Sequence, residues 1–240
     1  MVDSYLNIKC YFYYLKISFL FLFLLSFHFC KENKSNSSLP KEAIYEKKTN
    51  SYSLITDGKK KVWNEKGQLF SEVELDEVQR ENGNAKTYFP ENGKLLSTGK
   101  YKNGEREGIW EWYFPNGNLY YRSGYSPDKK RQVWIATNVL GNEHGIHERY
   151  YENGQLEEKG SYEYGLKVGK WEKYYKNGKP EHYGSFKNDK KIGKWIYLYP
   201  DGKIVTEENF DENGKLINRS TFYPDGSPEC MITEKEKKCL

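Results

Sequence analysis

Residues 154–178 read GQLEEKGSYEYGLKVGKWEKYYKNG, and this stretch decides the fold because its marks return at a fixed interval. The pattern that begins at Gly154 begins again at Gly178, and also at Gly93, with 24 residues from each of these glycines to the next turn glycine. The shared marks are two further glycines, a tryptophan and the next turn glycine: Gly99, Gly108, Trp110 and Gly117 in one copy, Gly160, Gly169, Trp171 and Gly178 in the next, and Gly184, Gly193, Trp195 and Gly202 in the last. A short fixed period indicates a stack of small units, none of which buries its apolar face alone.

Turn signals separate short aromatic runs throughout this region. Dipeptides such as Asn116-Gly117, Asn153-Gly154 and Asp201-Gly202 tolerate the left-handed backbone of tight hairpin turns. The runs between them are too short and too rich in glycine for helices, so we predict an all-β fold: an elongated single sheet of antiparallel β-hairpins over residues 51–226. Glycines inside strands indicate bulges or close approach of a ring. We therefore expect each repeat tryptophan to lie over a glycine of an adjacent unit.

Composition agrees with a core made of rings. Hydrophobic residues make up only 37% of the chain, while aromatic residues reach 17%, so Tyr, Trp and Phe must supply most of the packing. The net charge is +4, and the short basic runs are interleaved with acidic residues. A nucleic-acid partner is not expected, because such proteins usually gather positive charge on one face.

The first 30 residues indicate a signal peptide or membrane-anchor helix that precedes the fold. Lys9 and Lys16 come before the apolar run of residues 17–29, which is shorter than the roughly 20 residues of a spanning helix. An uncleaved anchor remains the alternative. The run ends at Cys30 and resembles a bacterial lipoprotein signal, which implies lipidation of that cysteine. We expect residues 31–50 to be a flexible tether, and the domain to be membrane-anchored in the cell envelope, outside the cytoplasm.

The array is irregular in its middle and at its ends. The interval from Gly117 to Gly154 is 13 residues too long, which predicts a lengthened arm near residues 127–139. The first unit lacks the tryptophan, and the last has Ile217 and Arg219 in place of Gly and Trp, as capping units would. Residues 227–240 are expected to form a C-terminal tail, in which Cys230 and Cys239 either pair as a disulfide in an oxidising compartment or remain free thiols.

No residue pattern points to catalysis, a metal or a cofactor, and we expect no enzymatic activity. His144 and His147 would lie on opposite faces of a strand, which does not suit a metal site. His147 stands where other units have tryptophan, so a packed ring is expected there.

The segments 113–119 and 150–156 resemble MORN repeats, and the 24-residue spacing with its Gly-x-Trp-x-x-Tyr step resembles the bacterial MORN-variant family often labelled YwqK-type antitoxin. The resemblance implies a β-hairpin array that serves as a binding scaffold, and the antitoxin label implies a toxin partner. The secretory signal argues against a cytoplasmic antitoxin role.

We therefore predict a non-catalytic envelope scaffold that binds a protein partner. Stacking of sugar rings on the aromatic strips, as in glycan or peptidoglycan binding, is an alternative. The candidate contact residues are three tyrosine pairs near the strand ends: Tyr120, Tyr121, Tyr150, Tyr151, Tyr174 and Tyr175.

Overall fold

The computed structural model describes residues 39–126, 143–233 and 235–239, and these residues form strands and turns with no helix among them. The chain divides into two units, and all of the described residues belong to the second, Asn36–Leu240. The predicted all-β fold is confirmed. The anchor helix, Cys30 and the long arm near residues 127–139 fall outside the described residues.

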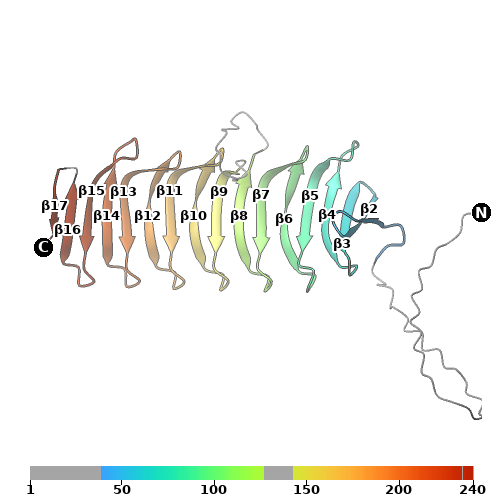
Figure 1. Ribbon diagram of the computed structural model, residues 1–240, viewed down its shortest axis with the longest axis horizontal. Helices are drawn as coiled ribbons and strands as arrows, with labels where there is room; N and C mark the ends of the chain where they lie inside the picture. The colour runs from blue at the N-terminus through green and yellow to red at the C-terminus, as the bar shows by residue number, and fades with distance from the viewer. Residues whose placement is uncertain (1–38, 127–142, 234, 240) are drawn as a thin grey trace, which may run out of the picture. The chain divides into compact units, whose positions relative to one another are not determined.

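The described part of the chain contains 17 strands in one open antiparallel sheet, and consecutive strands are hydrogen-bonded neighbours (Figure 1). Their bounds are β1 Ile44–Glu46, β2 Ser51–Thr56, β3 Lys59–Asn64, β4 Leu69–Leu75, β5 Glu81–Tyr88, β6 Leu95–Lys102, β7 Glu105–Tyr113, β8 Leu119–Tyr125, β9 Glu143–Tyr150, β10 Leu156–Glu163, β11 Leu166–Tyr174, β12 Pro180–Lys187, β13 Lys190–Leu198, β14 Ile204–Phe210, β15 Leu216–Phe222, β16 Pro228–Thr233 and β17 Lys237–Cys239.

The repeated Asn-Gly turns join the strands along one side of the sheet. Gly154 and Gly178 have positive φ angles of 85° and 80°, and their N–H groups donate to the carbonyl three residues earlier at 2.8 and 2.9 Å. The side chain of Asn153 accepts a hydrogen bond from the Gln155 N–H at 3.1 Å. Asparagine and glycine are therefore required by the hydrogen bonding and the backbone of the turn.

A wide bulge recurs in the strand that carries the tryptophan. Lys159 pairs with Glu172 and Ser161 pairs with Val168, so β11 has two more residues than β10 between these pairs. Gly169 lies in the bulge with a φ of 65°, which a residue with a side chain rarely adopts. The extra length lets Trp171 arch over the neighbouring strand, and the pairs β6–β7 and β12–β13 show the same irregularity.

Both ends of the sheet extend further than expected. Residues 44–46, within the predicted tether, form β1 and pair with β2. Residues 227–240, predicted as a tail, instead contain β16 and β17. Cys230 and Cys239 are directly opposite each other on these two strands and are joined by a disulfide. The correction has a simple cause: a short strand that adds to an existing sheet needs little apolar surface of its own.

Candidate binding surface

Each repeat tryptophan is buried against a glycine of the strand before it. A Cβ atom built on Gly99, Gly160 or Gly184 would lie 2.2 Å from the Cδ2 atom of Trp110, Trp171 or Trp195 respectively. These rings are only 2–3% exposed although the sheet is a single layer. Stacking of rings over glycines is thus confirmed, but the glycine belongs to the same hairpin and not to an adjacent unit.

Indole N–H groups and cations complete the environment of these rings. The Trp110 Nε1–H donates to the Lys100 carbonyl at 2.9 Å, and the Trp195 Nε1–H donates to the Ser185 carbonyl at 3.1 Å. A cation two residues before each bulge glycine lies over each ring, with distances to the ring centroid of 4.7 Å from Arg106, 3.9 Å from Lys167 and 4.8 Å from Lys191. Glycine beneath and cation above leave little of the ring open to a ligand.

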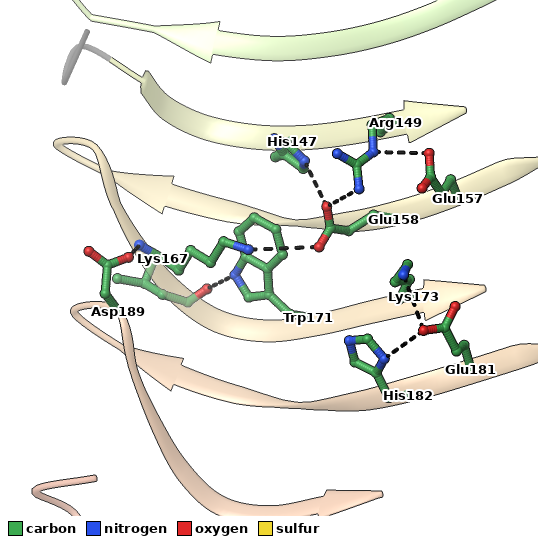
Figure 2. Close-up of polar contacts among 11 residues, drawn as sticks. His147, Arg149, Glu157, Glu158, Lys167, Trp171, Lys173, Glu181, His182 and Asp189 are labelled. Atoms are coloured by element: carbon green, nitrogen blue, oxygen red, sulfur yellow. Dashed lines mark hydrogen bonds and ion pairs between the residues drawn. The ribbon is translucent and has the colours of Figure 1, made fainter. Parts of the chain in front are cut away.

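A charge cluster surrounds Glu158 on this face, which we call the ring face (Figure 2). Its carboxylate lies 3.1 Å from Arg149 Nη2, 3.6 Å from His147 Nε2 and 3.7 Å from Lys167 Nζ. Burial alone would raise the pKa of Glu158, but the His147 contact and the charges of Lys167 and Arg149 outweigh it and hold the pKa at about 2. The backbone of Lys167 is fixed by Asp189, whose carboxylate accepts its N–H at 2.8 Å.

His147 replaces tryptophan in the middle of the array, and it is buried among rings as expected. It is 6% exposed, with ring centroids 5.0 Å from Trp171, 5.2 Å from Tyr121 and 5.3 Å from Tyr162. The cation position of this unit holds Glu143. The unit with histidine in place of tryptophan thus also lacks the cation that covers the ring in the tryptophan units.

The last unit replaces tryptophan with Arg219, which pairs with the buried carboxylate of Glu208 at 2.8 Å. Burial alone would raise the pKa of Glu208. The hydrogen bond from Arg219 and the charge of Lys191 lower this pKa by more than burial raises it, so the net shift is downward.

His182 is a separate case on β12. Burial lowers the pKa of its side chain, and its ring packs 5.4 Å from the Tyr197 ring.

Most of the candidate tyrosines have structural partners. The Tyr121 hydroxyl donates to Glu143, and the Tyr150 hydroxyl donates to Glu148 at 2.9 Å. The Tyr174 ring lies 5.8 Å from Lys159 Nζ. Tyr120 differs, because it is 43% exposed and contacts mainly the Phe114 ring at 4.9 Å. Tyr120 is therefore the member of the set best placed to touch a partner.

The remaining two tyrosines join consecutive turns. The Tyr151 hydroxyl donates to the Tyr174 carbonyl at 2.7 Å, and the Tyr175 hydroxyl donates to the Leu198 carbonyl at 2.6 Å. Tyr199 repeats the contact with the Phe222 carbonyl at 3.4 Å. We call these contacts tyrosine bridges. They stabilise the packing of one unit on the next, which sequence reasoning missed although Tyr-x-Asn-Gly and Tyr-x-Asp-Gly were visible signals.

The face opposite the ring face carries a row of alternating charges. Glu111, Arg122, Glu148, Lys159 and Glu172 are successive cross-strand partners on β7 to β11. Arg122 lies 2.9 Å from Glu111 and 3.2 Å from Glu148, and Lys159 lies 2.7 Å from Glu172. Opposite charges in register stabilise the sheet and neutralise one another.

A metal ion needs a close grouping of ligand side chains. Within residues 39–126, 143–233 and 235–239, no three His, Cys, Asp or Glu side chains are grouped as ligands. His144 is exposed and packs 5.0 Å from the Tyr164 ring, while His147 is buried. In the same described ranges, no helix is long and apolar enough to cross a membrane.

No curated protein matches the chain. Similar solved structures include TarM, at 16% identity with a TM-score of 0.28, and a mutant of S. aureus TarM in complex with fondaparinux, alpha-GlcNAc-glycerol and UDP, at 15% identity with a TM-score of 0.28. Each comparison covers 40% of this chain and 19% of the TarM chain, so the chain matches about a fifth of that length.

Four stretches, residues 106–126, 143–164, 167–188 and 191–212, match the family model of the MORN repeat variant. Three of them begin at or next to the cation that covers a tryptophan, namely Arg106, Lys167 and Lys191. The matched stretches are the strand pairs β7–β8, β9–β10, β11–β12 and β13–β14, and each of them is similar to the MORN repeat variant.

Proposed function

We propose that this protein is a non-catalytic repeat scaffold of the bacterial cell envelope that binds another protein. The observation that carries the proposal is a set of exposed apolar side chains on three successive strands. Ile109 on β7, Tyr120 on β8 and Ile146 on β9 are 46%, 43% and 41% exposed. Exposed apolar and aromatic side chains on a rigid sheet are typical of protein interfaces.

The charge pattern supports a protein partner over a nucleic acid. The basic residues Arg122 and Lys159 are paired with glutamates, so little unpaired positive charge remains in the row opposite the ring face. A nucleic acid would need a basic stripe.

A glycan partner receives less support from the same geometry. Sugar rings stack on open aromatic faces, whereas Trp110, Trp171 and Trp195 are 2–3% exposed and covered by cations. A toxin partner would be one case of a protein partner. The basic residues and apolar run of the first 30 residues support export from the cytoplasm, and therefore favour an envelope partner.

The binding proposal is tested with two aspartate substitutions and a matched control. Ile109→Asp and Ile146→Asp should each abolish cross-linking of the partner captured from envelope extracts. Ile217→Asp changes an equally exposed isoleucine (48%) on the distant strand β15 and should leave capture unchanged. Failure to capture any reproducible partner, or equal capture by all three variants, would refute the proposal.

The location is tested separately. We propose that Cys30 carries the lipid that holds the domain at the membrane, with residues after it as a spacer. Metabolic labelling with a fatty acid should mark the wild-type protein and not the Cys30→Ala variant. Equal labelling, or none in either protein, would show that the N-terminal segment anchors or targets the domain in another way.

A further inference from the structure

The tyrosine bridges show what fills the space between consecutive turns of the array. Tyr151, Tyr175 and Tyr199 each open a turn, and each places its ring toward the next turn while its hydroxyl donates to the carbonyl just before that turn. Lysines add a second contact between turns. Lys179 Nζ donates to the Asp201 carbonyl at 3.4 Å, and Lys203 Nζ donates to the Pro224 carbonyl at 2.6 Å.

The turn between β3 and β4, which we call the first turn, lacks both side chains. Asn64 occupies the tyrosine position, because its N–H donates to the Gln68 carbonyl at 2.9 Å just as the Tyr199 N–H donates to the Lys203 carbonyl at 2.8 Å. The Asn64 side chain has no hydroxyl, and its amide donates to Gln68 Oε1 at 2.8 Å. Gln68 in turn stands in the lysine position. Neither side chain makes the contact with the next turn that its counterparts make.

A pocket of about 660 Å³ occupies the place of the missing tyrosine. It lies between the first turn and the turn that joins β5 to β6, which we call the second turn. Its walls include the apolar and aromatic residues Trp63, Leu69, Tyr88 and Pro90, and also the polar residues Gln68, Glu91 and Asn92. Trp63 is only 6% exposed, so this wall is firmly packed. We call this space the N-terminal pocket. Tyr88 immediately precedes the second turn, so its carbonyl corresponds to the acceptors of the three bridges.

We propose that the N-terminal pocket binds a tyrosine side chain presented by a protein partner, with the ring between the two turns and the hydroxyl donating to the Tyr88 carbonyl. This inference rests on the proposed function and names one residue through which the partner docks. The chain itself shows three times which group fits between two turns. Phe114 fills the same turn position without a hydroxyl, so ring packing supplies the fit and the hydrogen bond adds selectivity.

The pocket is tested without knowing the partner, by titrating the full-length protein with N-acetyl-L-tyrosinamide and following NMR signals. The Trp63 indole N–H and the amides of Gly67 and Gly93 should shift saturably. N-acetyl-L-phenylalaninamide should bind roughly two- to tenfold more weakly, because it cannot make the hydrogen bond. Equal affinity for the two amides, or shifts spread over the whole sheet, would overturn the proposal.

Two variants sharpen the test. Asn64→Tyr should fill the pocket from within, abolish the titration shifts, and keep or raise the melting temperature. Tyr199→Asn should create a second pocket, with new shifts at Gly202 and Gly226 upon titration. Unchanged shifts in a well-folded Asn64→Tyr variant would refute the assignment of the pocket.

Partner capture separates this proposal from the general function. Loss of capture by Asn64→Tyr supports both. Capture that Asn64→Tyr leaves unchanged supports the scaffold and overturns the role of the pocket in docking. A successful titration without any captured partner supports the pocket chemistry and overturns the scaffold proposal.

Discussion

Replacing Gly184 by alanine places a methyl group where the Trp195 ring already lies. The new Cβ would be 2.2 Å from Cδ2, 2.3 Å from Cε2 and 2.5 Å from Cγ of that ring, whereas carbon atoms in contact are normally about 3.5–4.0 Å apart. Gly184 is not in the left-handed region, so the substitution has no backbone strain of its own. The whole effect therefore measures how closely the ring packs on the strand.

The expected destabilisation follows from two opposing contributions. Overpacking of a filled site costs about 1–3 kcal/mol. Alanine also restricts the unfolded chain, which stabilises the fold by about 0.4–1 kcal/mol. We expect a net loss of about 1–2 kcal/mol for Gly184→Ala. Trp195→Ala should cost about 3–5 kcal/mol, because this ring is 2% exposed.

A double-mutant cycle isolates the contact. In Gly184→Ala/Trp195→Ala the ring is gone, so the added methyl should be harmless and the double variant no less stable than Trp195→Ala. The coupling energy should be about −2 kcal/mol. Gly193→Ala is the matched control, because its Cβ meets nothing within 4 Å but its φ is 63°, so its cost of about 1 kcal/mol should persist without the ring.

The measurement is urea unfolding followed by far-ultraviolet circular dichroism. Repeat arrays can unfold unit by unit, so hydrogen exchange of the β12 and β13 amides provides the local readout. If Gly184→Ala is as stable as the wild type, or if the double variant loses the sum of both single effects, the ring does not pack on this glycine as described.

Three further predictions concern charge, the tyrosine bridges and the disulfide. The pKa of Glu158 lies at about 2 in the fold against an ordinary 4.5, so its ionised form should contribute about 3 kcal/mol to the free energy of unfolding above pH 4.5, and this contribution should be lost as the pH falls toward 2. When urea midpoints are measured against pH, the Glu158→Gln variant should lack this pH-dependent loss. Parallel losses in both proteins would contradict the prediction. Tyr175→Phe should cost about 1 kcal/mol by removing the hydrogen bond to the Leu198 carbonyl, measured by urea unfolding, and a neutral result would show that the bridge is not stabilising. Cys239→Ser opens a disulfide between residues nine apart and should cost about 2–3 kcal/mol locally, so that exchange accelerates in β16 and β17 alone; acceleration across the whole sheet would contradict a local role.

The sequence predicts the sheet well because its signals are local. An Asn-Gly turn, a glycine in a bulge and a tryptophan two residues later each act within one hairpin, and their period is visible without a structure. The sequence does not show which strand receives the Trp171 ring, because that depends on the extra length of β11 relative to β10. We expected an adjacent unit, and the bulge turns the ring back onto Gly160 of the same hairpin.

The binding surface was harder to predict because exposure depends on partners across strands. Six tyrosines looked equivalent as contact candidates, yet Tyr151 and Tyr175 bridge consecutive turns while Tyr120 remains exposed. Composition alone cannot distinguish a bridging phenol from a free one. The cations at Arg106 and Lys167 were also missed, although each stands two residues before a bulge glycine, and that spacing is a usable signal in other chains of this kind.

The tyrosine bridges have a consequence for how such a protein changes length during evolution. A hairpin that contains both a turn-opening tyrosine and the carbonyl before the next turn brings its own means of joining the neighbours on either side. Tandem duplication of one 24-residue hairpin would therefore regenerate every contact at the new junction and lengthen the sheet by about 10 Å, which is two strand spacings. The reach of the array can thus be adjusted by whole hairpins while each existing unit keeps its own packing.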